Sequence, residues 1–150
     1  MRAVVQRVKH ASVTVEEKIV GKIGLGLLVL VGFEESDGQE DFDWIIKKIT
    51  QLRIFPDEQG VMNISVQDVK GSILIVSQFT LHASTKKGNR PSYIKSSPPE
   101  TAKKQYDKFV ESVQKQYFYK IQTGVFGADM KVKLLNDGPV TICLDSKNKE

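Results

Sequence analysis

The side chains with the clearest potential for chemistry lie at residues 77–81, in the order Ser-Gln-Phe-Thr-Leu. They follow an apolar run, residues 73–76, that is typical of a buried strand. Polar groups at the end of such a strand are held rigidly: Ser77 and Thr80 offer hydroxyls, Gln78 offers an amide, and backbone N–H groups could stabilise an oxyanion. The same pattern describes a strand that turns polar where it leaves the core, and the pattern alone favours this second interpretation.

Neither histidine is predicted to activate these hydroxyls. A nucleophilic serine or threonine needs an adjacent base, and the chain holds only two histidines, His10 and His82. His82 is near Thr80 in sequence, but side chains two residues apart share a face only if the strand continues. We therefore predict that both histidines are surface side chains and that no Ser-His-Asp triad is present.

Residues 136–141, Asn-Asp-Gly-Pro-Val-Thr, form the second unusual stretch. Asp-Gly followed by Pro is typical of a tight turn between two strands. Because Gly138 has no side chain, carbonyl groups of the Gly138-Pro139 pair could also line a pocket without obstruction. Spacing alone favours the ordinary hairpin.

Two loops carry further candidates. Lys86, Lys87 and Arg90 belong to a basic loop, which is either a mobile surface turn or a phosphate contact. Residues 124–130, Gly-Val-Phe-Gly-Ala-Asp-Met, are more typical of a core plug than of a base pocket. Neither loop has the spacing of a phosphate loop or of a dinucleotide site.

The basic residues are concentrated in one part of the chain. The net charge is only +4, yet residues 82–120 hold nine Lys and Arg against three Asp and Glu. Such a stretch is compatible with a polyanionic partner, although a solvated lysine-rich face is the commoner explanation.

Composition excludes several classes of protein. Cys143 is the only cysteine, so the chain has no internal disulfide and no cysteine zinc cluster. No acidic cluster suggests a metal site, and we expect neither a metal nor another cofactor. The longest apolar run, residues 25–33, is far shorter than the ~20 residues that span a bilayer. Residues 1–8 are typical of a strand rather than a signal peptide, so we expect a cytoplasmic protein without membrane association.

The elements that must position these residues suggest one α+β domain over residues 1–150. Apolar residues recur at helical spacing between Phe42 and Leu52, and Asp37 can cap this first helix. Ser97 and Glu100 have the spacing of a capping box for a second helix, with Pro98 in its first turn. Apolar runs predict about seven strands, including separate strands at 130–135 and 140–144.

Five motifs, in this order, make the chain similar to a known family over essentially its whole length. The SQFTL and NxGPVT motifs are the most specific of them. The chain resembles the D-aminoacyl-tRNA deacylase family, also called D-tyrosyl-tRNA deacylase. The motifs are Gln6-Arg7-Val8, residues 77–81, residues 87–91, Gly124 with Phe126-Gly127-Ala128 and Met130, and residues 136–141.

The resemblance implies a fold, an activity and partners. The fold would be a single α+β domain with a mixed or antiparallel, barrel-like sheet and two main helices, assembled as a homodimer with active sites at the interface. The substrate would be D-aminoacyl-tRNA, and glycyl-tRNA mischarged on tRNA-Ala. Hydrolysis of the ester at the 3′-terminal adenosine would release free tRNA.

The resemblance also implies roles for individual residues. Gly138-Pro139 would be a cis peptide that enters the partner's site and excludes L side chains, with Arg7 holding it in position. Backbone N–H groups near Phe79 would handle the ester carbonyl. Ser77, Gln78, Phe79 and Thr80 would line the catalytic pocket, Gly127, Ala128 and Met130 the adenosine site, and Lys86, Lys87 and Arg90 would meet tRNA phosphates.

Two mechanisms and a second function remain open. Thr80 could attack the ester, or the 2′-hydroxyl of the tRNA could help to activate water; we favour the second because no strong base lies near Thr80 in sequence. The basic stretch 82–120 is also compatible with a nucleic-acid-binding module without catalysis. A dimerisation domain of another role is disfavoured by the motifs.

Overall fold

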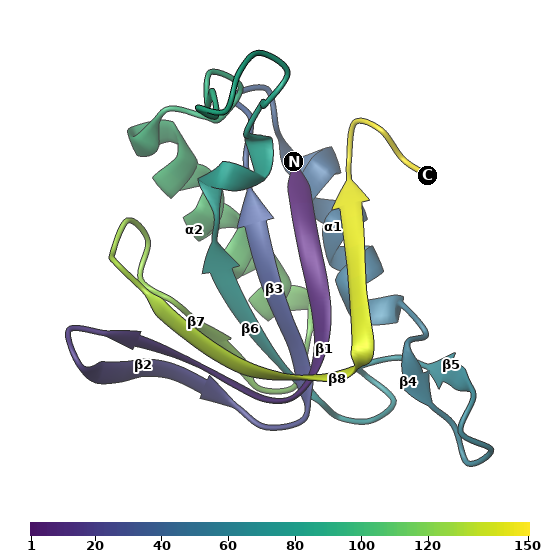
Figure 1. The fold of residues 1–150 in the computed structure, drawn as a ribbon. Coiled ribbons are helices and arrows are strands. Elements are labelled where there is room, and N and C mark those ends of the chain that lie inside the picture. Colours follow the sequence, from purple (N-terminus) through teal and green to yellow (C-terminus); the bar gives the residue numbers. More distant parts are fainter.

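The computed structural model describes all 150 residues. A mixed sheet, two helices and a small hairpin make up the chain (Figure 1). The elements are β1 (Arg2–Val15), β2 (Lys18–Ile23), β3 (Gly26–Gly32), α1 (Gln39–Gln51), β4 (Phe55–Pro56), β5 (Met62–Ile64), β6 (Ser72–Ser77), the 3-10 helix η1 (Phe79–His82), α2 (Pro99–Gln116), β7 (Ile121–Thr123) and β8 (Lys131–Asp145). Neither helix has the length and apolar character needed to cross a membrane.

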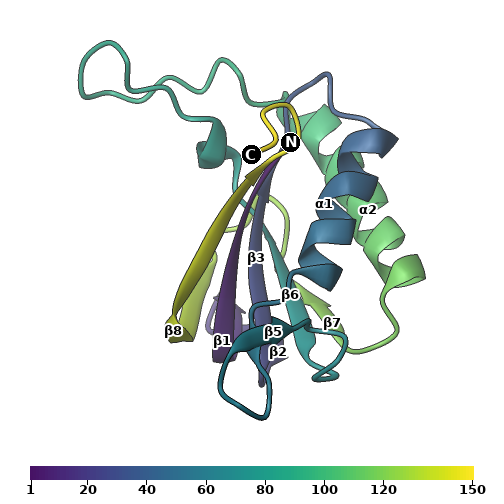
Figure 2. The ribbon, with the colours of Figure 1, turned by 90° about the vertical axis from the view of Figure 1, so that its right-hand side faces the viewer.

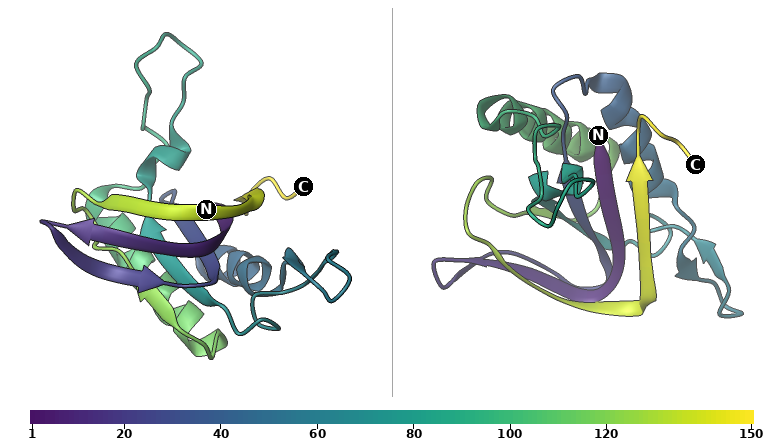
Figure 3. Two further views of the ribbon diagram at one scale, coloured as in Figure 1. Left: turned by 60° about the horizontal axis from the view of Figure 1, so that its bottom comes forward. Right: turned by 45° about the horizontal axis from the view of Figure 1, so that its top comes forward.

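The main sheet has the order β2-β1-β3-β6-β7, with β8 on the other edge of β1. β1 pairs antiparallel with β2, β3 and β8, whereas β3-β6 and β6-β7 are parallel. β1 and β8 bend together, so the sheet curls (Figures 1 and 3). β2 then approaches β7 and nearly closes a barrel: a Cβ on Gly21 would lie only 2.6 Å from the carbonyl oxygen of Thr123. The expected α+β fold with a mixed, barrel-like sheet and two main helices is confirmed.

Each face of the sheet packs against its own apolar core. α1 and α2 lie on one face (Figure 2) and cover the larger core, in which the rings of Phe33, Phe42 and Phe109 meet edge to face with centroids 5.9–6.2 Å apart. The smaller core lies in the curl of the sheet. Because β3 and β6 have a core on both faces, they are apolar along their length rather than alternating. The smaller core consists of Val8, Ala11, Val13, Ile23, Leu28, Leu74 and Val76.

Both predicted helix caps are wrong. α1 starts after Gly38, whose N–H donates to Asp41, while the Asp37 carboxylate is drawn into a buried ion pair with the N-terminal ammonium. α2 starts at Pro99, one residue later than a Ser97 cap requires. Two consecutive prolines set this start, because neither can lie deeper in the helix. Ser97 is instead buried, and its hydroxyl forms no hydrogen bond.

The near closure of the barrel predicts different costs for two glycine substitutions. An alanine at position 21 meets the Thr123 carbonyl at 2.6 Å and a Leu74 methyl at 3.1 Å, so Gly21→Ala should lower the free energy of unfolding by about 1–3 kcal/mol. Gly24, in the turn after β2, has nothing within 4 Å of an added Cβ. Urea unfolding of Gly24→Ala should match the parent chain within about 0.5 kcal/mol. Equal stability of the two variants would show that β2 and β7 separate easily.

Candidate active site

A sharp turn follows β6 and leaves two backbone donors without acceptors. The Gln78 N–H donates to the carbonyl oxygen of Val31 at 2.7 Å, after which the chain enters η1. The N–H groups of Phe79 and Thr80 open this 3-10 helix, so they have no acceptor within it, and no other backbone or side-chain group accepts from them. The turn therefore presents two adjacent N–H groups that can bind an oxyanion.

The hydroxyl of Thr80 is engaged by an amide and not by a base. The Gln78 side-chain nitrogen donates to Thr80 Oγ1 at 2.5 Å. The prediction that His82 is a surface side chain is wrong, because η1 turns its imidazole inward against Gly32, where it is 1% exposed. Its Nδ1 lies 3.1 Å from a Glu34 carboxylate oxygen. The other histidine, His10, is exposed as predicted.

A pocket of about 600 Å³ opens beside this turn. The end of β6 and the start of η1 form one wall, and residues 126–130 form another, so two motifs 50 residues apart in sequence meet. Residues 126–130 also serve the core, since Phe126 packs on Tyr106 and Met130 on the smaller core. The pocket is lined by Val76, Ser77, Gln78, Phe79, Tyr93, Ser96, Ser97, Pro98, Pro99, Ala102, Phe126, Gly127, Ala128, Asp129, Met130 and Val132.

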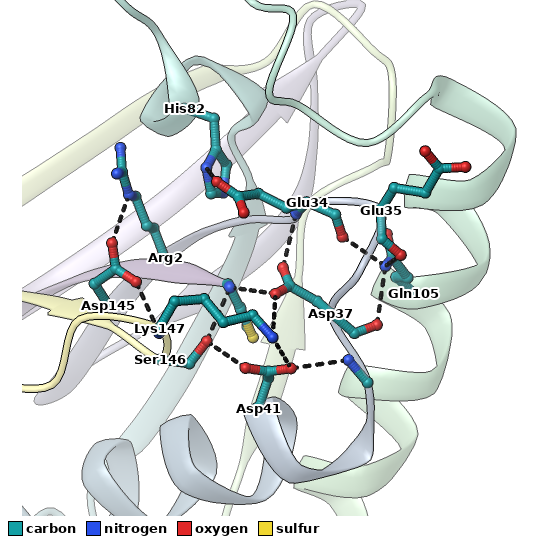
Figure 4. A network of polar contacts seen from close by, with 12 residues as sticks. Arg2, Glu34, Glu35, Asp37, Asp41, His82, Gln105, Asp145, Ser146 and Lys147 are labelled. Carbon is teal, nitrogen blue, oxygen red and sulfur yellow. Dashed lines mark hydrogen bonds and ion pairs between the residues drawn. The ribbon is translucent and has the colours of Figure 1, made fainter.

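The two ends of the chain meet in a polar network next to η1 (Figure 4). Arg2 donates to the carbonyl oxygen of Leu81 at 3.0 Å and to the Asp145 carboxylate at 2.8 Å. Beside it, the N-terminal ammonium of Met1 pairs with Asp37 at 2.5 Å and donates to the Ser146 hydroxyl at 2.9 Å. No sequence motif indicates this network, because its members are far apart in the chain and belong to no local pattern.

Residues 136–141 form a bulge inside one strand, so the predicted tight turn and the two separate strands are wrong. Gln6 pairs with Thr141 and Val8 with Asn136, which leaves four residues of β8, Asp137–Val140, opposite the single residue Arg7. The Gly138-Pro139 peptide within the bulge is cis, and both residues are exposed.

Arg7 and Asn136 hold this bulge in shape. The guanidinium of Arg7, which is 8% exposed, donates to the carbonyl oxygens of Asp137, at 2.8 Å, and of Ile54. The amide of Asn136 spans the bulge, accepting from the Val140 N–H at 2.8 Å and donating to the Val140 carbonyl at 3.2 Å. The backbone around Gly138 is therefore fixed by side chains of the same chain. The contribution of Asn136 could not be inferred from spacing, because it depends on the bulge.

The bulge and the pocket do not meet within one chain. Arg7, opposite the bulge, pairs with Leu27 near the start of β3, whereas Gln78 bonds to Val31 near its end. The two features therefore lie toward opposite ends of the sheet (Figure 1).

The basic loop is a hairpin that projects from the body of the protein (Figure 2). Ser84 and Ser92 close it through two backbone hydrogen bonds of 2.8 and 2.9 Å. Lys86, Lys87 and Arg90 are exposed and form no ion pair. Their charges are therefore not compensated by acidic side chains of the chain.

The family model described as D-Tyr-tRNA(Tyr) deacylase matches residues 4–145. The chain belongs to this family. The D-aminoacyl-tRNA deacylases of Bacteroides thetaiotaomicron and Flavobacterium johnsoniae are 63% and 64% identical to it, with all of each chain covered. The predicted family and the expectation of an enzyme are thus confirmed.

Two solved structures resemble this deacylase-family chain. The structure of a c-Myc DNA Unwinding Element Binding Protein has a TM-score of 0.92 and 45% identity, covering 97% of this chain and 98% of that one. A probable eukaryotic D-amino acid tRNA deacylase has a TM-score of 0.81 at 17% identity, covering 95% and 97%, and supports the fold alone.

The network beneath η1 predicts a loss of stability in acid. Burial raises the pKa of Asp41, but hydrogen bonds from Lys147, Ser146 and the Gly38 N–H outweigh it and lower the pKa to about 2. Because the pKa is lower in the folded chain than the ordinary 3.8, Asp41 stabilises the fold above about pH 4, and this contribution is lost as the pH falls toward 2.

Unfolding free energies between about pH 5 and pH 2 should therefore fall more steeply for the parent chain than for Asp41→Asn. Glu58→Gln, which removes an exposed carboxylate from the hairpin between β4 and β5, is the control and should keep the parent slope. Identical slopes for all three proteins would contradict the assignment of this pH dependence to Asp41.

Proposed function

We propose that this chain hydrolyses the ester bond between a D-amino acid and the 3′-terminal adenosine of tRNA, acting in the cytoplasm. Family membership supports the reaction class. The single observation that carries the mechanism is the turn after β6, where two N–H groups without acceptors lie at the edge of a pocket. An aminoacyl ester is already activated, so positioning and oxyanion stabilisation can supply much of the rate enhancement.

In the proposed reaction, the N–H groups of Phe79 and Thr80 bind the ester carbonyl oxygen as it becomes negative. Water attacks with help from the neighbouring 2′-hydroxyl of the tRNA, and the protein supplies no nucleophile. The contacts of Thr80 support this version, since its oxygen accepts a hydrogen bond from Gln78 and is not hydrogen-bonded to His82. Attack by Thr80 itself is the second candidate mechanism.

The pocket is proposed to hold the terminal adenosine. Gly127, Ala128 and Met130 form one side of it, and Ser77 and Gln78 the other. A largely apolar pocket with a few polar groups suits a purine ring flanked by a ribose. The ester carbonyl would then reach the start of η1.

Selection between D and L substrates is proposed to come from the bulge of a second copy. Within one chain the bulge and the pocket lie apart, so a homodimer with the active site at the interface would be required to bring them together. The exposed Gly138-Pro139 backbone, held by Arg7, would occupy the space of an L side chain. A filter built from backbone also accepts glycine, so glycyl-tRNA mischarged on tRNA-Ala is a second proposed substrate.

The basic loop is proposed to meet phosphates of the tRNA acceptor stem. Lys86, Lys87 and Arg90 form no ion pair in the chain, and the hairpin that carries them extends outward from η1 (Figure 3). Contacts of this kind position a nucleic acid without reading its sequence. They also favour the second candidate function, nucleic-acid binding without catalysis.

Ester loss from D-Tyr-tRNA and L-Tyr-tRNA tests the proposal directly. The parent protein should remove only the D ester. In Gly138→Ala, the added Cβ lies 2.7 Å from Val140 atoms at a φ of +154°, so the bulge must shift. A shift of about 1 Å can cost about a hundredfold in rate, and we expect a loss of that size in kcat/KM for the D ester.

Gly60→Ala is the matched control for this experiment. Gly60 also has a positive φ, +79°, but it lies in the exposed hairpin between β4 and β5. This variant should keep D-selective hydrolysis. A parent-level kcat/KM for the D ester in Gly138→Ala would remove the bulge from the mechanism. No loss of either ester with the parent protein would favour nucleic-acid binding without catalysis.

Removal of the Thr80 hydroxyl separates the two mechanisms. If water attacks, Thr80→Ala should keep single-turnover deacylation within about tenfold of the parent rate, because only the hydrogen bond with Gln78 is lost. Thr80→Val, which keeps the volume of the side chain, controls for packing. A fall to the uncatalysed rate with tRNA binding intact would instead identify Thr80 as the nucleophile.

A further inference from the structure

Two aromatic side chains stand together at the mouth of the pocket and remain accessible to solvent. Phe79 is 56% exposed and Tyr93 is 39% exposed. Their ring centroids lie 5.0 Å apart with the planes at 68°, and both residues line the pocket. The hydroxyl of Ser96 donates to the Phe79 carbonyl at 3.0 Å, which ties the two segments together. This aromatic pair is thus a fixed apolar surface that continues the pocket outward.

Positive charge without an acidic partner lies on the same segment as Tyr93. The backbone bridge between Ser84 and Ser92 closes the basic loop immediately before Tyr93, so the lysines of the loop and the ring of Tyr93 share one segment. Lys95, two residues beyond Tyr93, is also exposed. Exposed aromatic rings beside cations are the combination by which proteins bind single-stranded nucleic acid, with bases stacked on the rings and phosphates near the charges.

We infer that the aromatic pair binds the penultimate base of the single-stranded 3′ end of tRNA. The inference rests on the proposed function, which places the terminal adenosine in the pocket. The next base along the strand then lies outside the pocket mouth, where Phe79 and Tyr93 are. Bases in single-stranded RNA are free to stack on aromatic side chains, and the edge-to-face packing of the pair leaves ring surface available.

Charge favours RNA over a second copy of this chain as the occupant. A two-fold contact through the aromatic pair would place the same patch of each subunit against the other. The two basic loops would then approach each other, and like charges brought together oppose association. An RNA strand instead brings phosphates to Lys86, Lys87 and Arg90.

Truncated substrates test the site. The D-tyrosyl ester of adenosine fills only the pocket, whereas the D-tyrosyl ester of the trinucleotide CCA also reaches the aromatic pair. Tyr93→Ala should reduce the preference for the trinucleotide over the nucleoside, as the ratio of kcat/KM values, about tenfold. Tyr93→Phe should keep the parent preference, because the Tyr93 ring is retained and its hydroxyl makes no hydrogen bond. Phe118→Ala removes an aromatic ring that is 88% exposed and follows the C-terminal end of α2. This variant should change kcat/KM for neither substrate.

Three results would overturn the inference. One is an equal loss on both substrates in Tyr93→Ala, which would assign Tyr93 to the pocket itself. Another is a Tyr93→Ala variant that keeps the parent preference for the trinucleotide over the nucleoside. The third is a change in molar mass of Tyr93→Ala by light scattering, which would show that a second copy covers the pair.

Equilibrium binding of uncharged CCA and of adenosine separates this inference from the proposed function. The parent protein should bind CCA more tightly, and Tyr93→Ala should lose that advantage. If the parent protein binds CCA more tightly, Tyr93→Ala loses that advantage, and the parent cleaves no ester, the base site is supported. Only the proposed reaction would then be contradicted.

Discussion

The pairing of β1 with three other strands is the constraint on which the rest of the structure depends. A strand has two edges, and β8 occupies one of them along nearly the whole length of β1. β3 takes the first half of the other edge and β2 takes the second half. β1 must therefore bend where its partner changes, and β8 bends with it. The bulge opposite Arg7 lies near this bend and absorbs four residues without ending the strand.

The same strand positions both parts of the proposed active site. Arg2, at the start of β1, holds the turn after β6 through the Leu81 carbonyl, and Arg7, five residues on, holds the bulge through the Asp137 carbonyl. The curl creates the second core, against which Met130 packs while lining the pocket. In each case a charged or apolar side chain fixes a segment of backbone, and the backbone is the part proposed to contact the substrate.

Local patterns predicted much of the architecture but not the contacts between distant segments. The apolar runs and helical stripes indicated the strands and both helices, because burial on one or two faces leaves a periodic signature. The cap of α1 was mispredicted because a distant group, the N-terminal ammonium, recruits Asp37. The turn at 136–141 was mispredicted because its pairing with β1 is not a local property. Family resemblance named Arg7, while its two carbonyl partners became clear only from the fold.

Covalent probes would find no activated side chain to react with in a site built mainly from backbone groups. The two N–H groups after Gln78 belong to the main chain and remain whatever side chains occupy positions 79 and 80, so an alanine scan would pass over them. Reagents that trap an activated serine or cysteine would find neither a triad nor a thiol among the residues lining the pocket. The inhibitors that suit this geometry are analogues that mimic the charge and shape of the reacting ester. Their adenosine part would bind in the pocket.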